Sequence, residues 1–264
     1  LFLSKLISLI FTDSMYKKQS NIAEIDLSLN RIKKVFKEIN FPCKGIPAIQ
    51  IIGTNGKGSI AKFIESCLIE SGIKIGCTTS PHLIDWRERI CVNGKEISAQ
   101  DFKRFVTKIG NLGLELTQFE LIIISALDYF SYKNTELIIL EAGLGGRLDA
   151  TTIHPNRPLI AIGNIGLDHC EYLGNTLEEI TREKAAVISP GSVVISAKQN
   201  INVTKVIEEI ACKKKATIKW VNSLSNEWQL GIPGEIQRDN AAVAKGILEE
   251  LKPLGWLIKE QQIR

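Results

Sequence analysis

Residues 49–59 restrict the possible folds of this chain more than any other segment, and they read Ile-Gln-Ile-Ile-Gly-Thr-Asn-Gly-Lys-Gly-Ser. The apolar residues at the start predict a buried strand, which breaks into a glycine-rich turn at Gly53. An amphipathic helix is predicted to begin near Ser59. Successive backbone N–H groups in such a turn, together with the positive end of the following helix, form a cradle for phosphate.

Lys57 adds a positive charge that suits the β- and γ-phosphates of a nucleotide. The usual phosphate loop continues with Ser or Thr, whose hydroxyl binds magnesium, but this chain has Gly58 there and Ser59 one position later. A magnesium ligand is therefore expected from elsewhere in the chain. A glycine-rich turn without a ligand is the alternative, but the combination of strand, lysine and helix favours a nucleotide site.

Strands and helices alternate along the rest of the chain. Strands are predicted at 73–78, 136–140, 159–162, 193–195 and 216–221, with a short strand at 228–230. A hairpin is predicted in which Arg89–Val92 and Glu96-Ile97 flank the turn at Asn93-Gly94. Helices are predicted at 27–39, 58–71, 99–110, 118–132, 176–188, 201–214 and 238–252, and Leu1–Phe11 is expected to dock as an amphipathic helix. This order predicts an α/β fold with a mostly parallel sheet and helices on both faces.

The composition excludes several classes of protein. The 264 residues are 44% hydrophobic and 23% charged, as in a soluble globular protein, and the net charge of +4 is too small for a nucleic-acid-binding surface. The apolar start is too short to span a bilayer, so no membrane partner is expected. The six cysteines lack a C-x-x-C spacing, which favours reduced thiols and a cytoplasmic location.

Three polar residues follow predicted strand ends: Ser80, Glu141 and His169. Ligands of parallel sheets bind at the carboxyl ends of the strands, so these three residues are expected to share one rim with the phosphate loop. Lys184 lies on the helix predicted at 176–188, on a face that is expected to pack inward. Glu141 either binds magnesium or caps a neighbouring helix, and His169 either binds metal or phosphate or is an ordinary loop residue. Lys184 is either a surface lysine or, if buried, a neutral amine that can form a carbamate with carbon dioxide.

Several motifs together resemble the folylpolyglutamate synthase/dihydrofolate synthase family of the Mur ligase superfamily. The resemblance covers about residues 25–250, and Gly58 is characteristic of it. Its motifs are Gly-Thr-Asn-Gly-Lys-Gly-Ser, Thr-Ser-Pro-His-Leu, Arg-Glu-Arg-Ile at 87–90, Thr-Gln-Phe-Glu at 117–120, the run from Glu141 to Ala150, Leu-Asp-His at 167–169 and Arg-Glu-Lys-Ala at 182–185.

The resemblance implies a P-loop NTPase-like Mur ligase central domain that uses ATP and Mg²⁺, and it implies roles for particular residues. The phosphates of ATP would be held by Gly53, Thr54, Asn55, Gly56, Lys57, Gly58 and Ser59, with Asn240 on the nucleotide. Magnesium would be bound by Ser80, Glu141 and His169, and Lys184 would be carbamylated. The pteridine-bearing substrate would face Thr117, Gln118, Phe119, Leu148, Asp149 and Ala150. Thr152 and Ile236 depart from the family pattern, where Asn and often His stand.

The implied reaction is ATP-dependent addition of L-glutamate to dihydropteroate, to folates or to both, through an acyl phosphate; the catalytic residues would be Lys57, Glu141, His169 and Lys184. The alternatives are another Mur-type ligase, a regulatory P-loop switch protein, and a non-catalytic remnant that keeps the nucleotide site. The chain lacks the Asn-Lys-x-Asp motif by which a guanine-nucleotide switch would be identified.

The resemblance also implies two domains and about 400 residues. Residues 1–252 are expected to form the ATP-binding domain, and residues 253–264 the start of a linker to a smaller C-terminal domain that this chain lacks. We expect a monomer. Because closure of the two domains would complete the site, we also expect that this chain alone binds Mg-ATP weakly and ligates poorly or not at all.

Overall fold

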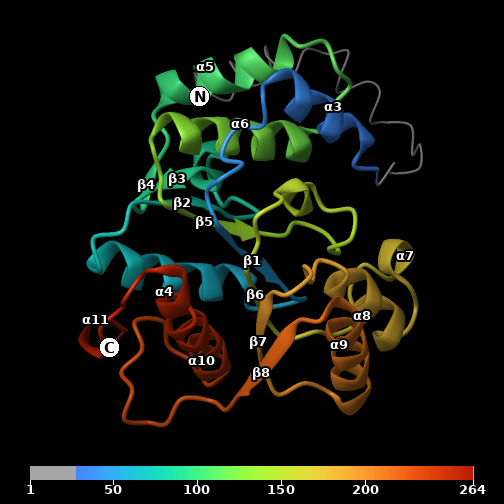
Figure 1. Ribbon diagram of the computed structural model, residues 1–264, viewed down its shortest axis with the longest axis vertical. Helices are drawn as coiled ribbons and strands as arrows, with labels where there is room; N and C mark the ends of the chain where they lie inside the picture. The colour runs from blue at the N-terminus through green and yellow to red at the C-terminus, as the bar shows by residue number, and fades with distance from the viewer. Residues whose placement is uncertain (1–27, 264) are drawn as a thin grey trace.

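The computed structural model describes residues 28–263, and its centre is one eight-stranded sheet in the order β4-β3-β2-β5-β1-β6-β7-β8 (Figure 1). The strands are β1 (Ala48–Ile52), β2 (Ile75–Thr78), β3 (Cys91–Val92), β4 (Lys95–Glu96), β5 (Leu137–Glu141), β6 (Leu159–Ile162), β7 (Val193–Ala197) and β8 (Thr217–Val221). All neighbouring pairs from β2 to β8 are parallel, and β3 and β4 form an antiparallel hairpin at the edge. The expected α/β fold is confirmed.

Helices cover both faces of this sheet. They are α3 (Asn30–Glu38), α4 (Lys57–Glu70), α5 (Ala99–Gly110), α6 (Gln118–Tyr132), α7 (Cys170–Leu173), α8 (Leu177–Ala185), α9 (Ile201–Lys214), α10 (Ile236–Glu249) and α11 (Glu260–Ile263), with 3₁₀ turns η1 (Trp86–Arg89), η2 (Ala150–Ile153) and η3 (Lys252–Leu254). Helices α4, α10 and α11 cover one face, and the other face carries α3, α5 and α6 at one end and α8 and α9 at the other (Figure 1).

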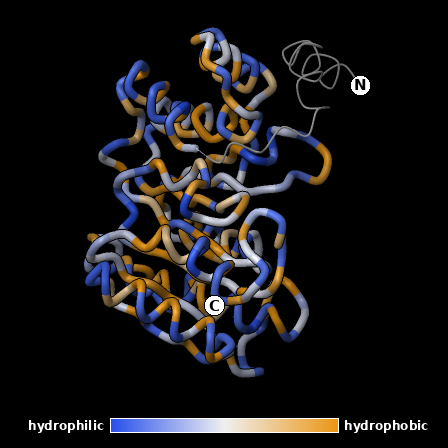
Figure 2. Tube along the Cα trace, turned by 90° about the vertical axis from the view of Figure 1, so that its right-hand side faces the viewer, coloured by the Kyte–Doolittle hydropathy of each residue, from blue (hydrophilic) through white to orange (hydrophobic). Residues whose placement is uncertain are grey.

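The buried side chains form three apolar cores. One lies between the sheet and α4 and α10, a second below α3, α5 and α6, and a third against α8 and α9. Strand β1 contributes to all three, because its residues are buried on both faces of the sheet. Along the helices around the sheet, hydrophobic and hydrophilic positions alternate, as Figure 2 shows.

The second and third cores share one face of the sheet, and a polar cluster lies between them. Ala48 belongs to the second core and Ile52 to the third, and Gln50 stands between them on the same face of β1. The buried Gln50 amide donates to the hydroxyls of Thr151 (3.0 Å) and Thr152 (2.9 Å), and its carbonyl oxygen accepts from Arg157. We call Gln50, Thr151, Thr152 and Arg157 the polar seam.

Most predicted elements are present, with shifted ends. The strand predicted at 228–230 is wrong: Trp228 lies in a turn whose backbone is tied to Ser225 and to the Arg238 side chain. Arg89 belongs to a 3₁₀ turn rather than to the edge hairpin. The helix predicted at Leu1–Phe11 lies outside the described residues.

The segment predicted as a linker packs against the domain. Trp256, Ile258 and Ile263 contact the core below α4, and the Gln262 amide donates to the Glu70 carbonyl at 3.4 Å. Within residues 28–263, no helix combines the length and the apolar character needed to cross a bilayer.

Candidate nucleotide-binding site

The glycine-rich turn after β1 is held open by the loop after β6. Thr54 donates its backbone N–H to the Asn164 carbonyl at 2.7 Å, and Asn55 forms an isolated bridge with the same residue. The Thr54 hydroxyl accepts from the Gly166 N–H at 3.1 Å and donates to the Gly166 carbonyl at 3.0 Å. Sequence reasoning missed this support, since a glycine and asparagine after a strand are common in any loop.

Helix α4 begins at Lys57, directly after Gly56, which adopts a left-handed conformation with φ of +84°. A Cβ on Gly56 would lie 2.3 Å from the Asn240 carboxamide oxygen, so only glycine fits against α10. Asn240 is buried and donates to the Gln237 side chain at 2.9 Å. The structure therefore places Asn240 on the phosphate loop, although the two are far apart in sequence.

The Lys57 ammonium group lies over the loop, where it donates to the carbonyls of Gly53 (3.2 Å) and Thr54 (3.1 Å). Neither partner is charged, so no anion among residues 28–263 is paired with this ammonium group. The structure thus brings the largely half-buried turn, the N-terminus of α4 and this lysine together, which is the arrangement that the sequence predicts.

Glu141 ends the neighbouring strand β5 and is buried next to α4. Its carboxylate accepts from the Ser80 backbone N–H at 3.1 Å, and a Cβ on Gly58 would lie 3.7 Å from it. Burial raises the pKa of Glu141 to about 7, although the Ser80 N–H and the Lys57 charge oppose this shift. A buried carboxylate that resists ionisation fits a site completed by a cation.

Lys184 lies on α8 and is buried, as expected if it serves the site. Its ammonium group donates to the Gly53 carbonyl at 3.1 Å, which is the same oxygen that Lys57 contacts. Burial and then the Lys57 charge lower the pKa of Lys184 to about 8. A substantial fraction of this amine is therefore neutral near pH 8.

His169 lies at the start of α7 with φ of +48°, and half of its side chain is exposed. Its ring nitrogens lie 3.6 Å from the Asp168 carboxylate and 4.0 Å from the Glu171 carboxylate. No contact joins it to Glu141 or Ser80 in the described part of the chain. Residues 28–263 also contain no group of three or more His, Cys, Asp or Glu side chains arranged for a metal. Of the predicted magnesium ligands, Ser80 and Glu141 are thus in contact, and His169 is apart.

The residues predicted to face the substrate fall into two groups. Phe119, at the start of α6, packs on Gly143, where an added Cβ would lie 2.7 Å from the ring. Thr117 caps α6 and is exposed at its end, beside the half-buried Gln118. The Asp149 carboxylate points inward, because it accepts from the N–H groups of Gly143 (2.8 Å) and Leu144 (2.9 Å). Asp149 therefore shapes the glycine loop 143–146, between the half-buried Leu148 and the buried Ala150.

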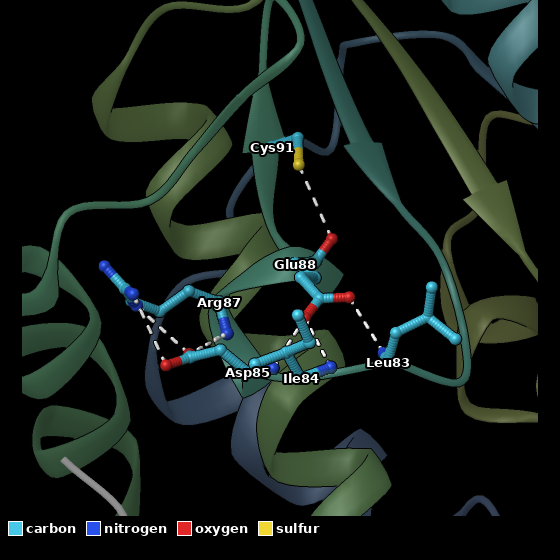
Figure 3. Close-up of polar contacts among 6 residues, drawn as sticks. All are labelled: Leu83, Ile84, Asp85, Arg87, Glu88 and Cys91. Carbon is cyan, nitrogen blue, oxygen red and sulfur yellow. Dashed lines mark hydrogen bonds and ion pairs between the residues drawn. The ribbon is translucent and has the colours of Figure 1, made fainter. Parts of the chain in front are cut away.

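A loop from Thr79 to Ile90 connects β2 to the edge hairpin, and the Glu88 carboxylate organises it (Figure 3). Glu88 accepts from the backbone N–H groups of Leu83 (2.8 Å), Ile84 (2.7 Å) and Asp85 (2.5 Å). The side chains of Leu83 and Ile84 are almost fully exposed despite this fixed backbone. Sequence reasoning noted the Arg-Glu-Arg-Ile motif but assigned no task to its glutamate.

Comparisons with known proteins agree with this geometry. The chain is 34% identical over 249 residues to a dihydrofolate synthetase of Saccharomyces cerevisiae, covering 86% of this chain and 58% of that protein. It is 39% identical over 202 residues to a dihydrofolate synthase/folylpolyglutamate synthase of Buchnera aphidicola, covering 73% and 47%. The chain thus spans about half the length of these relatives. No family model matches it.

Solved structures share the fold over most of this chain. A folylpolyglutamate synthase of Thermotoga maritima superposes with a TM-score of 0.81 at 28% identity, covering 90% of this chain and 61% of that one. Escherichia coli FolC, in complex with DHPP and ADP, gives a TM-score of 0.80 at 29% identity, covering 95% and 64%.

Proposed function

Because this chain belongs to the folylpolyglutamate synthase/dihydrofolate synthase family, we propose that it carries the ATP-binding part of a ligase that joins L-glutamate to a pteroate or folate carboxylate. The observation that supports this most strongly is the phosphate loop at Gly53–Lys57, backed by the buried Glu141 and Lys184. A Ser-His-Asp arrangement, which a hydrolase would use, is not formed by the three histidines within the described residues.

The proposed reaction has two steps. An oxygen of the acceptor carboxylate bonds to the γ-phosphorus of ATP while the bond to the bridging oxygen breaks, so ADP leaves and an acyl phosphate forms. The amine nitrogen of glutamate then bonds to the acyl carbon, phosphate leaves and a proton is released. Neither step needs a nucleophilic side chain; both need negative charge to be stabilised.

The described residues supply that stabilisation at the phosphate end. The Thr54 and Asn55 N–H groups are taken by the Asn164 carbonyl, so the N–H groups of Gly56 and of the first turn of α4, with the Lys57 ammonium group, would bind the β- and γ-phosphates. The Glu141 carboxylate and the Ser80 hydroxyl fit a hard cation such as Mg²⁺, since both offer oxygen ligands and Glu141 is held 3.1 Å from the Ser80 N–H. Magnesium would neutralise charge on the phosphates. We assign His169 a weaker role in binding magnesium, because it lies apart from Glu141.

Lys184 and the substrate-facing residues complete the proposal. The lowered pKa of Lys184 supports carbamate formation, which requires a neutral amine. The half-buried Phe119 and Leu148 offer apolar surface for a pteridine ring. Asp149 instead supports the glycine loop 143–146, because its carboxylate accepts from the Gly143 N–H. The acceptor, dihydropteroate or a folate, is left to experiment. The six free cysteines support a reducing, cytoplasmic location.

Nucleotide binding and turnover test this proposal separately. We expect the chain to bind ADP and AMPPCP, and Lys57→Ala to weaken AMPPCP binding about tenfold or more, because a charge-assisted phosphate contact is lost. Phosphate release should then be measured with ATP, glutamate and each pteroate or folate in turn.

The matched control is Lys103→Ala, an exposed lysine on α5 far from the loop. It should leave nucleotide affinity unchanged, and both variants should keep the unfolding temperature of the parent chain. Equal AMPPCP affinity in the parent and Lys57→Ala proteins would contradict the nucleotide site.

A further inference from the structure

Arg89 lies at the end of the Thr79–Ile90 loop, on the opposite side of Glu141 from the phosphate loop. Cys91, two residues later, pairs with Cys77 on β2, so Arg89 returns to the sheet near the start of this loop. Strand β2 pairs with β5, which ends at Glu141, and the Ser80 N–H contacts the Glu141 carboxylate. The order at this rim is therefore phosphate loop, Glu141, Ser80, Arg89.

Two aromatic residues of the same loop fix the Arg89 guanidinium group. Its Nε donates to Nδ1 of His82 at 2.8 Å, and its centre lies 4.6 Å from the Trp86 ring. His82 must accept at Nδ1, because arginine only donates. Partial burial and the Arg89 charge lower the pKa of His82, which keeps its ring neutral and able to accept. Within residues 28–263, the two terminal amino groups of Arg89 make no hydrogen bond, because its only side-chain bond there is the one from Nε to His82.

Arg89 makes no ion pair with any of residues 28–263, although it is half-buried. The neighbouring Arg87 differs, since it makes two hydrogen bonds to the Asp85 carboxylate, at 3.0 and 3.3 Å. Burial lowers the pKa of Arg89, and the charges of Glu141 and then Glu88 oppose this shift. A half-buried guanidinium group held by neutral partners beside an active-site carboxylate is suited to an anionic ligand.

We propose that Arg89 binds the acceptor carboxylate that becomes phosphorylated, and that His82 and Trp86 position its guanidinium group for this contact. The proposal rests on the ligase function proposed above. A carboxylate fits the two terminal amino groups of the guanidinium group, since Nε is taken by His82, and each bound oxygen keeps a second lone pair with which one of them can reach the γ-phosphate.

The position of Arg89 favours the acceptor carboxylate, rather than the nucleotide, as the ligand of its guanidinium group. Lys57 and Lys184 already contact the phosphate loop, and Glu141 with Ser80 stands between that loop and Arg89. Phe119, which packs on Gly143 two residues after Glu141, is the apolar surface proposed above for the ring of the acceptor. An acceptor that extends from Phe119 toward Glu141 would bring its carboxylate to Arg89.

Equilibrium binding tests this inference without requiring turnover. Dihydropteroate and its carboxamide analogue should be titrated, with AMPPCP present, into the parent chain, Arg89→Gln, Arg89→Lys and the control Arg87→Gln. We expect Arg89→Gln to lose about tenfold or more in affinity for the carboxylate but not for the carboxamide. Arg89→Lys should lose less, because the charge remains without the bidentate geometry. Fluorescence of Trp86, which lies against Arg89, provides a local signal.

Each outcome is decisive. AMPPCP affinity within about twofold of the parent in both arginine variants supports the assignment. Unchanged preference for the carboxylate in Arg89→Gln overturns it while leaving the ligase function intact. A parent chain that binds AMPPCP but no pteroate or folate overturns both. If Arg89→Gln does not fold, as judged by circular dichroism, His82→Ala is the second variant; its unchanged carboxylate affinity would equally overturn the inference.

Discussion

The raised pKa of Glu141 makes the stability of the ligand-free protein depend on pH. Its carboxyl group is buried at the end of β5, and burial raises its pKa from 4.5 to about 7. Because the folded state binds this proton more tightly than the unfolded state, the contribution of Glu141 to stability falls as pH rises from about 4.5 to about 7. Above that range the protein holds a buried charge that a bound cation would balance.

We therefore predict that Glu141→Gln stabilises the ligand-free chain at pH 8 but not at pH 4.5. The gain at pH 8 should be roughly 1–3 kcal/mol, since the amide cannot ionise. Urea unfolding of both proteins across this pH range measures it, with the exposed Glu96→Gln as a control. Equal pH dependence in the parent and Glu141→Gln chains would mean that Glu141 ionises normally.

At the scale of elements, the Thr79–Ile90 loop is held together by the carboxylate of one residue, Glu88. Glu88 accepts three consecutive backbone N–H groups, and these contacts, first that of Leu83, lower its pKa. The contribution of Glu88 to loop stability is present above its ordinary pKa of 4.5 and is lost as pH falls through the lower folded value.

Glu88→Gln should loosen this loop while leaving the sheet intact. A neutral amide is a weaker acceptor than a carboxylate, and only its oxygen can accept. Hydrogen exchange at the Leu83, Ile84 and Asp85 amides should accelerate by about tenfold or more. Exchange at the buried strand residues should not change. Slow exchange at all three amides in the variant would show that other contacts fix the loop.

Elements whose ends are set by a few neighbouring residues could be predicted from the sequence. Thr176 and Glu179 form the capping box that begins α8, and Asn93-Gly94 turns the edge hairpin. Glu141 was placed at the end of its strand because four apolar residues precede it. The role of Glu88 could not be predicted, since it depends on the path of the loop. Likewise, the contact between Asn240 and Gly56 arises only when α10 packs against α4.

For the whole molecule, the polar seam decides how two apolar cores meet on one face of the sheet. Arg157 is its only cation in the described chain, and it is held by neutral oxygens: the Gln50 side chain and the carbonyls of His154 (2.7 Å) and Val187 (2.9 Å). Burial lowers the pKa of Arg157 to about 10. A half-buried charge whose partners are all neutral depends on each of those hydrogen bonds.

We predict that Gln50→Leu costs about 2–4 kcal/mol of unfolding free energy, because Arg157 loses an acceptor inside the protein. Arg157→Met should cost a similar amount. The double variant should cost less than the sum by about 1 kcal/mol or more, since it removes both members of the pair. Urea unfolding measures the cycle, with the exposed Gln100→Leu as a control. Additive costs would show that the two residues act independently.

The contact between Gly56 and Asn240 also has a consequence for synthesis on the ribosome. The glycine turn emerges early, but its partners arrive later: Asn164 from the loop after β6, Lys184 from α8, and finally Asn240 from α10. A nascent chain can form the first strands before Asn164, Lys184 and Asn240 are present to contact the glycine turn. The nucleotide site that we propose would therefore be complete in a nascent chain only after α10 has packed against α4.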